Sequence, residues 1–308
     1  MKKISVVRNV RWLVAGGLAV WSMAIVAGCT PGPAVLTNLV EARRLASALH
    51  VEFTKANEAA NRAVMGDTDA ASVDAAKEAE QATRRAVQSL QQLRPLLTSL
   101  GYQDELQSLN GFTQRFTEFQ TLDAEILPLA VENTNLKAQR LSFGAAQDAV
   151  DAFSTALLAS VKQAPVSSDA ANVAATSRAA LLEMQVLQAR HIAEADEAAM
   201  LRMESQMAAS EGVARKGLAR LRALIPASVS AGSGGSSVGP VSSLESADVA
   251  LERFISANQQ IVELSRRNSN VRSLALTLGR KRVVAAECAD QLRALEESLG
   301  KHGSQATR

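Results

Sequence analysis

Two asparagines stand in the apolar seams of long helical segments, where their side chains are expected to be buried. Asn133 and Asn268 each follow an isoleucine by seven residues and a phenylalanine by fourteen. A buried amide costs free energy unless it forms hydrogen bonds, and its best-attested use is to fix helix register and partner choice. The alternative is a ligand-binding polar layer that also contains Asn135 and Asn270.

Three arginines lie close to these asparagines in the sequence. Arg140 follows Asn133 by seven residues, and Arg267 and Arg272 flank Asn268. A guanidinium in such a seam is suited to a carboxylate, either of the protein or of a ligand. An internal acid for Arg140, expected near Asp196 and Glu197, would favour a structural role. Arginines that converge without an acid between them would favour a ligand site.

Metal, cofactor and catalytic chemistry find little support in the sequence. His191 and Glu194 have the spacing of di-iron bundle sites in reversed order, and no second copy exists. Neither a nucleophile elbow, a phosphate loop nor a zinc-protease motif is present. We expect no metal, no cofactor and no enzyme activity. Three methionines are expected to fill the core on a face opposite His191, namely Met200, Met203 and Met207.

The elements that must position these side chains are long helices. The chain after Pro33 is rich in strong helix formers, and sparse turn signals divide it into expected helices at 35–99, 104–163, 169–225 and 243–299. A Gly- and Ser-rich loop is expected at 228–242, a polar tail at 300–308, and a kink or break at Pro128.

Heptad periodicity gives the fold class. Apolar residues recur every seven positions at Leu122, Leu129, Leu136, Phe143, Val150 and Leu157, and at Leu264, Val271, Leu278 and Leu292. Sustained heptads indicate coiled-coil-like packing. The sequence therefore predicts an all-α protein, a long up-down four-helix bundle over 35–299.

The bundle is expected to consist of two duplicated helical hairpins, 35–163 and 169–299. The seams of the second and fourth helices coincide under an offset of 135, which matches Asn133 to Asn268 and Asn135 to Asn270. Residues 56–60 are paired with 195–199 in the first and third helices. Neither hairpin could bury both of its faces alone, so one domain is expected.

The polar motifs 132–138 and 267–272, placed mid-helix in a duplicated hairpin behind an apolar N-terminal segment, resemble the four-helix-bundle sensor domain of methyl-accepting chemotaxis proteins. The resemblance implies an extracytoplasmic fold that senses small molecules and is often a homodimer. Chemoreceptors continue into a second membrane span, whereas this sequence stops at Arg308. We therefore expect a stand-alone binding lipoprotein, or one that serves a separate transmembrane receptor.

Residues 1–29 have the pattern of a secretion signal, with a basic start and an uncharged stretch from Trp12 to Gly28. The end of this stretch, Val26 to Cys29, resembles the lipobox of bacterial lipoproteins, which implies lipidation of Cys29 and a short tether at 30–34. Thr30 then suggests the outer membrane, on its periplasmic side, in a Gram-negative host. The alternative is an uncleaved membrane helix of seventeen residues, at the lower limit for spanning.

Composition argues against a nucleic-acid partner. Four of the 33 basic residues and none of the 31 acidic residues precede Cys29, so removal of the leader changes the formal charge from +2 to −2. Phosphate binding needs a clustered positive field instead. The remaining cysteine, Cys288, lies in an apolar helical run and is expected to be buried.

Two functions follow. The first is an envelope module that binds a small polar or anionic solute at the asparagine layer or at a dimer interface. The second is a lipid-tethered structural spacer or protein-interaction scaffold without a small ligand.

Overall fold

The computed structural model describes residues 33–163, 168–225 and 239–306, and in these ranges the chain is helical and contains no strand. The all-α prediction is confirmed. In chain order the helices are α1 (Pro33–Val64), α2 (Asp69–Leu100), α3 (Gln103–Glu132), α4 (Thr134–Leu141), the π-helical turn η1 (Ser142–Ala146), α5 (Gln147–Gln163), α6 (Ser168–Ala193), α7 (Glu197–Leu224), α8 (Pro240–Arg267), α9 (Ser269–Leu276), the π-helical turn η3 (Thr277–Lys281) and α10 (Arg282–Ala306).

The expected helix at 35–99 is wrong, because the chain folds back between α1 and α2. Thr68 begins α2 with an extended backbone, and its hydroxyl accepts a hydrogen bond from the Ala71 N–H at 3.1 Å. Gly66 is required by close approach, since a Cβ there would lie 2.3 Å from Ser72 Oγ. A side-chain cap and a glycine therefore form this turn without a proline.

The expected helix at 169–225 is likewise two helices. Glu194 Oε1 accepts hydrogen bonds from the N–H groups of Ala195 and Asp196, both at 2.9 Å. The Asp196 carboxylate then caps α7 by accepting from two N–H groups of its first turn, at 2.8 and 3.4 Å. Two acidic side chains thus form a turn that the sequence pattern did not reveal.

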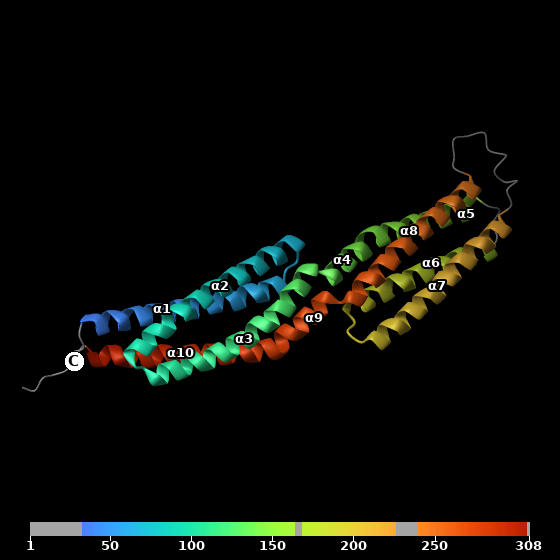
Figure 1. Ribbon diagram of the computed structural model, residues 1–308. Helices are drawn as coiled ribbons and strands as arrows, with labels where there is room; N and C mark the ends of the chain where they lie inside the picture. Colours follow the sequence, from blue (N-terminus) through green and yellow to red (C-terminus); the bar gives the residue numbers. More distant parts are fainter. Residues whose placement is uncertain (1–32, 164–167, 226–238, 307–308) are drawn as a thin grey trace, which may run out of the picture.

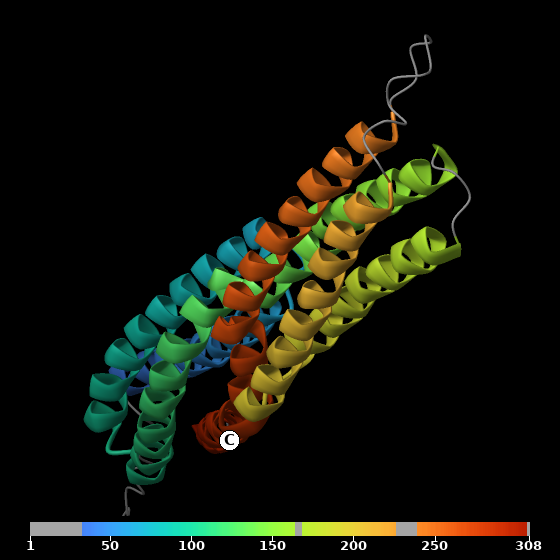
Figure 2. The same cartoon turned by 90° about the vertical axis from the view of Figure 1, so that its right-hand side faces the viewer.

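Both fold-backs change the architecture from one long bundle to two shorter bundles placed end to end. The first bundle packs α1 with α2 and α10, and α3 with α2 and α10; the second packs α6 with α5 and α7, and α8 with α5 and α7. Figures 1 and 2 show these bundles in line, with α3–α5 and α8–α10 running through both. The latter path, 240–306, is about 100 Å long at 1.5 Å per residue.

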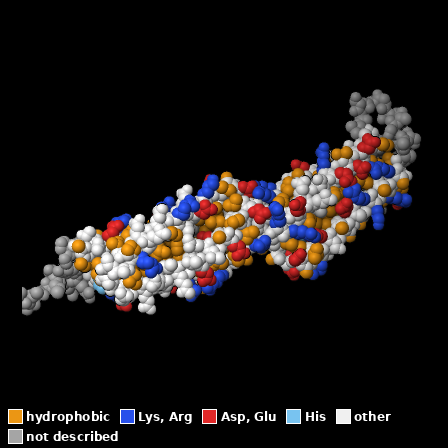
Figure 3. Space-filling view, in the orientation of Figure 1, with side chains coloured by type: hydrophobic (Ala, Val, Ile, Leu, Met, Phe, Trp, Pro, Cys, Tyr) orange, Lys and Arg blue, Asp and Glu red, His pale blue; other side chains and the backbone are white. Residues whose placement is uncertain are grey.

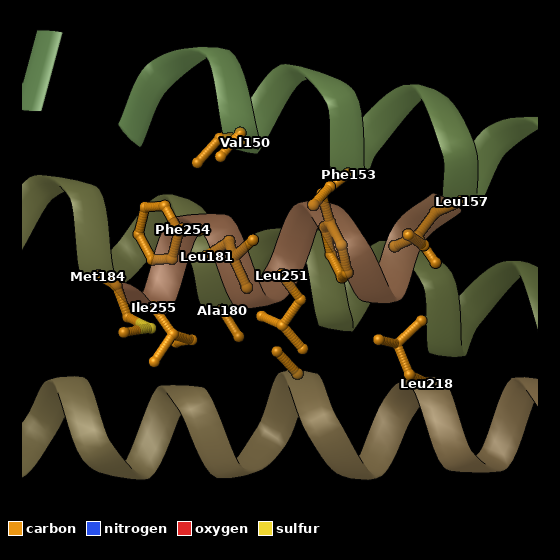
Figure 4. Packing of buried hydrophobic residues seen from close by; sticks show 14 of the residues in the cluster. Val150, Phe153, Leu157, Ala180, Leu181, Met184, Leu218, Leu251, Phe254 and Ile255 are labelled. Atoms are coloured by element: carbon orange, nitrogen blue, oxygen red, sulfur yellow. The ribbon is translucent and has the colours of Figure 1, made fainter. Parts of the chain in front are cut away.

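Each bundle has its own apolar core. The first is built around four phenylalanine rings, in which Phe53 lies 5.2 to 6.1 Å, centroid to centroid, from three rings of α3. The second is shown in Figure 4, where side chains of α5, α6, α7 and α8 converge between the helices. Met203 and Met207 belong to this core and Met200 is buried as well, as expected, but His191 is also fully buried. His191 and the methionines lie on different helices, which corrects its predicted outward position.

The two bundles are alike in their burial patterns. Each buried residue of α6 and α7, and Ile225 after them, has a counterpart that lies 128 positions earlier in α1 or α2. In all but two cases the earlier residue is also buried. The capping residues Thr68 and Asp196 have the same offset. The predicted match of 56–60 with 195–199 is therefore wrong, because the former is inside α1 and the latter crosses a turn. In the long helices the offset of 135 holds, since η1 and η3 begin 135 residues apart.

The predicted seam is interrupted in the middle of the molecule. Phe143 is 68% exposed and Leu278 is 60% exposed, whereas Val150, Leu157 and Leu292 on the same heptads are buried. Phe143 lies in η1 and Leu278 in η3. A π-helical turn accommodates an additional residue in the helix, so these two side chains rotate out of the core.

Several sequence predictions concern the ends of the described ranges. The leader 1–29, Cys29 and most of the tether lie outside the described residues, as does loop segment 228–238. The predicted polar tail at 300–308 is helical as far as Ala306, and residues 240–242 of the predicted loop belong to α8. Pro128 lies inside α3, four residues before that helix ends at Glu132.

The surface carries charges of both signs. On the face shown in Figure 3, Lys and Arg side chains alternate with Asp and Glu along both bundles. Within the described ranges, no helix has the length and hydropathy needed to cross a membrane.

Candidate functional site

The seven residues proposed from the sequence divide into two groups. The four asparagines meet in the middle of the molecule, where α3 passes into α4 and α8 into α9, whereas the three arginines are exposed. We call the paired segments 133–146 and 268–281 the waist.

The waist begins with two matched breaks in the long helices. Asn133 (φ 53°, ψ 38°) and Asn268 (φ 54°, ψ 35°) adopt the left-handed conformation, and they are the non-glycine residues with positive φ in the described ranges. Asparagine tolerates this region better than most residues. The prediction that both are buried at the same level is confirmed, but they end helices rather than continue them.

Helices α4 and α9 cap each other across these breaks. The Thr134 N–H donates to Ser269 Oγ and the Ser269 N–H donates to Thr134 Oγ1, both at 3.0 Å. The Asn135 N–H donates to Asn270 Oδ1 and the Asn270 N–H donates to Asn135 Oδ1, both at 3.1 Å. The first N–H groups of a helix lack intrahelical acceptors, and here each helix supplies them to the other.

The remaining amide groups bind the waist to both hairpins. Asn135 Nδ2 donates to Asn268 Oδ1 at 2.8 Å, and Asn270 Nδ2 donates to Asn133 Oδ1 at 2.7 Å. Asn133 Nδ2 reaches Ser72 Oγ of α2 at 3.0 Å, and Asn268 Nδ2 reaches the carbonyl oxygen of Glu194 at 2.7 Å. The polar groups of all four asparagines are thus engaged by the protein itself.

Two of the three arginines have internal acids. Arg140 Nη1 lies 3.8 Å from Asp69 Oδ2, and its Nη2 donates to the Asp67 carbonyl oxygen at 3.1 Å. Its expected acids near Asp196 are not its partners, because the fold-back of the first hairpin brings α2 to it instead. Arg267 Nη1 lies 2.9 Å from Glu132 Oε1. Arg272 is exposed.

Each bundle also contains a buried polar contact, and the contact in the first bundle involves residues that the sequence did not single out. In the first bundle, Lys281 Nζ lies 2.6 Å from Asp123 Oδ1 and 5.1 Å from the ring centroid of Phe119. Burial lowers the pKa of Lys281 and raises the pKa of Asp123, because it disfavours both charged forms. The positions 135 residues away are Ala146 and Asn258, so the ion pair belongs to the first bundle.

In the second bundle the buried polar contact is centred on His191. Its Nδ1 lies 2.7 Å from Ser265 Oγ and its Nε2 lies 2.9 Å from Glu204 Oε1. Hydrogen bonds from Arg266 above all, and from His191, hold the pKa of Glu204 below its usual range. Among the described residues, no group of three or more His, Cys, Asp or Glu side chains is placed to hold a metal ion.

Two grooves open beside the waist at equivalent positions. The first groove, about 480 Å³, lies between α1 and the segment from α9 to α10; the second groove, about 360 Å³, lies between α6 and the segment from α4 to η1. Their lining residues match under the two offsets, with Asn61, Met65, Thr277 and Leu278 in the first groove corresponding to Ala189, Ala193, Ser142 and Phe143 in the second.

A larger groove, about 1080 Å³, lies on the second bundle between α5, α7 and α8. Four of its six charged side chains pair with each other, since Arg215 binds Glu252 and Arg222 binds Asp248; the other two are Asp148 and Arg253. In the first bundle, Cys288 is fully buried as predicted, and burial raises the pKa of its thiol to about 12. A thiol in this state is protonated at neutral pH and is a poor nucleophile.

Comparisons with known proteins add no assignment: no protein family, no curated protein and no solved structure matches this chain.

Proposed function

We propose that the protein is a lipid-tethered envelope spacer, a rigid helical rod that holds its second bundle away from a membrane. The observation that carries this proposal is the waist. Both long helices are broken at the same level, yet each break is closed by the N-terminus of the other helix through four backbone-to-side-chain hydrogen bonds. Such reciprocal capping supports a fixed connection between the bundles.

The acid partners of Arg140 and Arg267 also support a structural role for the waist. Both guanidiniums form ion pairs with carboxylates of neighbouring helices, so neither is left to bind an anionic solute. The asparagines likewise direct their amides at the protein. A solute that bound here would have to replace internal hydrogen bonds, and buried polar groups left without partners are costly.

The proposed tether places the rod relative to the membrane. The start of α1 and the end of α10 lie at one tip of the molecule in Figure 1. Acylation of Cys29 would leave four residues to Pro33, a reach of roughly 14 Å. The first bundle would therefore stand next to the membrane, and the far tip would stand about 100 Å away.

Neutron reflectometry of the acylated full chain in a supported bilayer tests this proposal. An upright spacer gives a protein layer about 100 Å thick, whereas a bundle lying flat gives roughly 20–25 Å, two helix diameters. Cys29→Ser is the control and should not remain in the bilayer after washing. A thin layer of the acylated protein, or retention of the Cys29→Ser variant, would overturn the proposal.

Solute binding is the second candidate function, in keeping with the resemblance to chemoreceptor sensor domains. A different observation favours it: the first groove is lined by Arg282, which has no acid within ion-pair distance in the described protein, and by the amides of Asn57 and Asn61. A sensor of this kind would act together with a second copy of the chain or with a separate transmembrane receptor. It would not need the four asparagines of the waist as its binding site.

A further inference from the structure

The first groove differs from its counterpart in charge. Lys281 and Arg282 line the first groove and no acidic residue does, whereas the lining of the second groove contains no charged residue. Two repeats of one fold have thus produced two equivalent hollows, of which only the first carries cations. The difference is not needed for packing, because the second bundle has Ala146 at the position of Lys281.

Polar groups without partners face this groove. Asn57 and Asn61 are half-buried and one helical turn apart on α1, and neither amide has a hydrogen-bond partner in the described protein. Arg282 is exposed and has no acid within ion-pair distance. Lys281, 1% exposed, forms part of the floor. Its ammonium has three N–H donors, and Asp123 is its ion-pair partner.

The rest of the groove is apolar. Phe53 and Val64 are buried in its wall, and Met65 and Leu278 project at its rim with 72% and 60% of their surface exposed. A volume of about 480 Å³ is within the range of small-molecule pockets. The ionised pair of Asp123 and Lys281 is neutral as a unit, so Arg282 leaves one positive charge without an acid.

We propose that the first groove binds a small organic monoanion with an aliphatic body, a short-chain carboxylate. The carboxylate accepts hydrogen bonds from Arg282 and from the amides of Asn57 and Asn61, and the aliphatic body covers Leu278 and Met65. Charge-assisted hydrogen bonds to the head group supply orientation, and removal of apolar surface from water supplies affinity. This site deepens the solute-binding candidate and does not depend on the spacer proposal.

The test uses hexanoate as the probe and the methionine methyl groups as reporters. The described residues hold five methionines, of which Met65 lines the first groove and Met184, Met200, Met203 and Met207 are buried in the second bundle. In the full chain in nanodiscs, labelled with [13C]methyl-methionine, hexanoate should shift the Met65 resonance saturably with a Kd on the order of 1 mM. The buried methionines should not respond, and protein-free nanodiscs provide the blank.

Matched variants come from the two repeats. Leu278→Trp, which fills the first groove, and Arg282→Ala should each weaken hexanoate binding about tenfold or more, whereas Phe143→Trp, which fills the second groove, should leave it unchanged. Hexan-1-ol, which has the same body without the charge, should bind at least about tenfold more weakly.

Absence of a saturable Met65 shift would overturn the proposed site, and so would equal binding of hexan-1-ol or equal loss in Phe143→Trp. All the substituted residues are exposed, so folding should be retained and is checked by the buried methionine signals. None of these outcomes bears on the thickness of the protein layer in the bilayer, so the two proposals fail independently.

Discussion

At the residue scale, the pair of Asp123 and Lys281 places two ionisable side chains inside the core of the first bundle. Both side chains are almost completely buried, and their charged atoms contact each other and the face of Phe119. Removing two charges from water costs several kcal/mol per ion, and mutual attraction only about offsets this. Burial accordingly lowers the pKa of the lysine and raises the pKa of the aspartate. The pair is therefore expected to add little net stability.

We expect Lys281→Met to lower the free energy of unfolding by about 3–5 kcal/mol at pH 7, because it leaves Asp123 buried without a partner. The double variant Asp123→Leu/Lys281→Met should be as stable as the native chain or up to about 4 kcal/mol more stable. Urea denaturation of the three proteins measures both values. A double variant that is less stable than Lys281→Met would contradict this account.

The single variant should also depend on pH with a defined sign. A carboxyl group whose folded pKa is raised binds its proton more tightly in the folded state, so stability falls as pH rises above the ordinary value of about 3.9. The deficit of Lys281→Met should therefore be smaller at pH 5 than at pH 7. Urea denaturation at both values measures it, and a deficit that grows on acidification would contradict the burial of Asp123 as the cause.

At the element scale, the two broken helices show what a sequence pattern can and cannot predict. The burial of Asn133 and Asn268 follows from their heptad positions, because the seam is apolar on both sides of them. Their left-handed backbone does not follow, since heptads continue across a one-residue break. The exposure of Phe143 and Leu278 was also unpredictable, because a π-helical turn inserts a residue without changing the residue types around it.

The left-handed asparagines give a test at this scale. Asn133→Ala and Asn133→Gly both lose the amide bonds to Ser72 and Asn270. Only alanine is also strained in the left-handed conformation, whereas glycine gives the unfolded chain more conformational entropy. The net expectation is that Asn133→Ala is less stable than Asn133→Gly by about 1 kcal/mol. Urea denaturation measures the difference, and the same pair at Asn268 should repeat it. A glycine variant less stable than the alanine variant at both sites would exclude left-handed strain as the distinction.

At the scale of the whole molecule, the sequence predicted helices, a repeat and a matched polar level, but not the two bundles. The turn at Thr68 is formed by one capping side chain and a glycine, and the turn at Asp196 by two acidic side chains. Alanine-rich helices on either side of both turns keep a regular apolar spacing through them. The offset of 128 could not be seen in the sequence either. The two hairpins share which positions are buried, but they share few residue types at those positions. The offset of 135 was visible because asparagine is rare in a helical seam.

The rigidity of the rod can be measured across the waist. Asp74 and Arg202 are exposed, lie 128 positions apart and occupy equivalent places on α2 and α7, one in each bundle. Spin labels on Asp74→Cys and Arg202→Cys should give one narrow distance distribution, because both long helices and their reciprocal caps connect the bundles. The buried Cys288, with its raised thiol pKa, should stay unlabelled and needs no substitution.

Loss of the reciprocal caps should broaden this distribution. Asn135→Ala/Asn270→Ala removes two of the four cap acceptors and both amide donors to Asn133 and Asn268, while the bundle cores keep their packing. If the distribution is already broad in the otherwise unaltered chain, the waist is a hinge. A hinged pair of bundles could not hold a fixed distance from a membrane. The first groove would then be the feature that supports a function, namely solute binding.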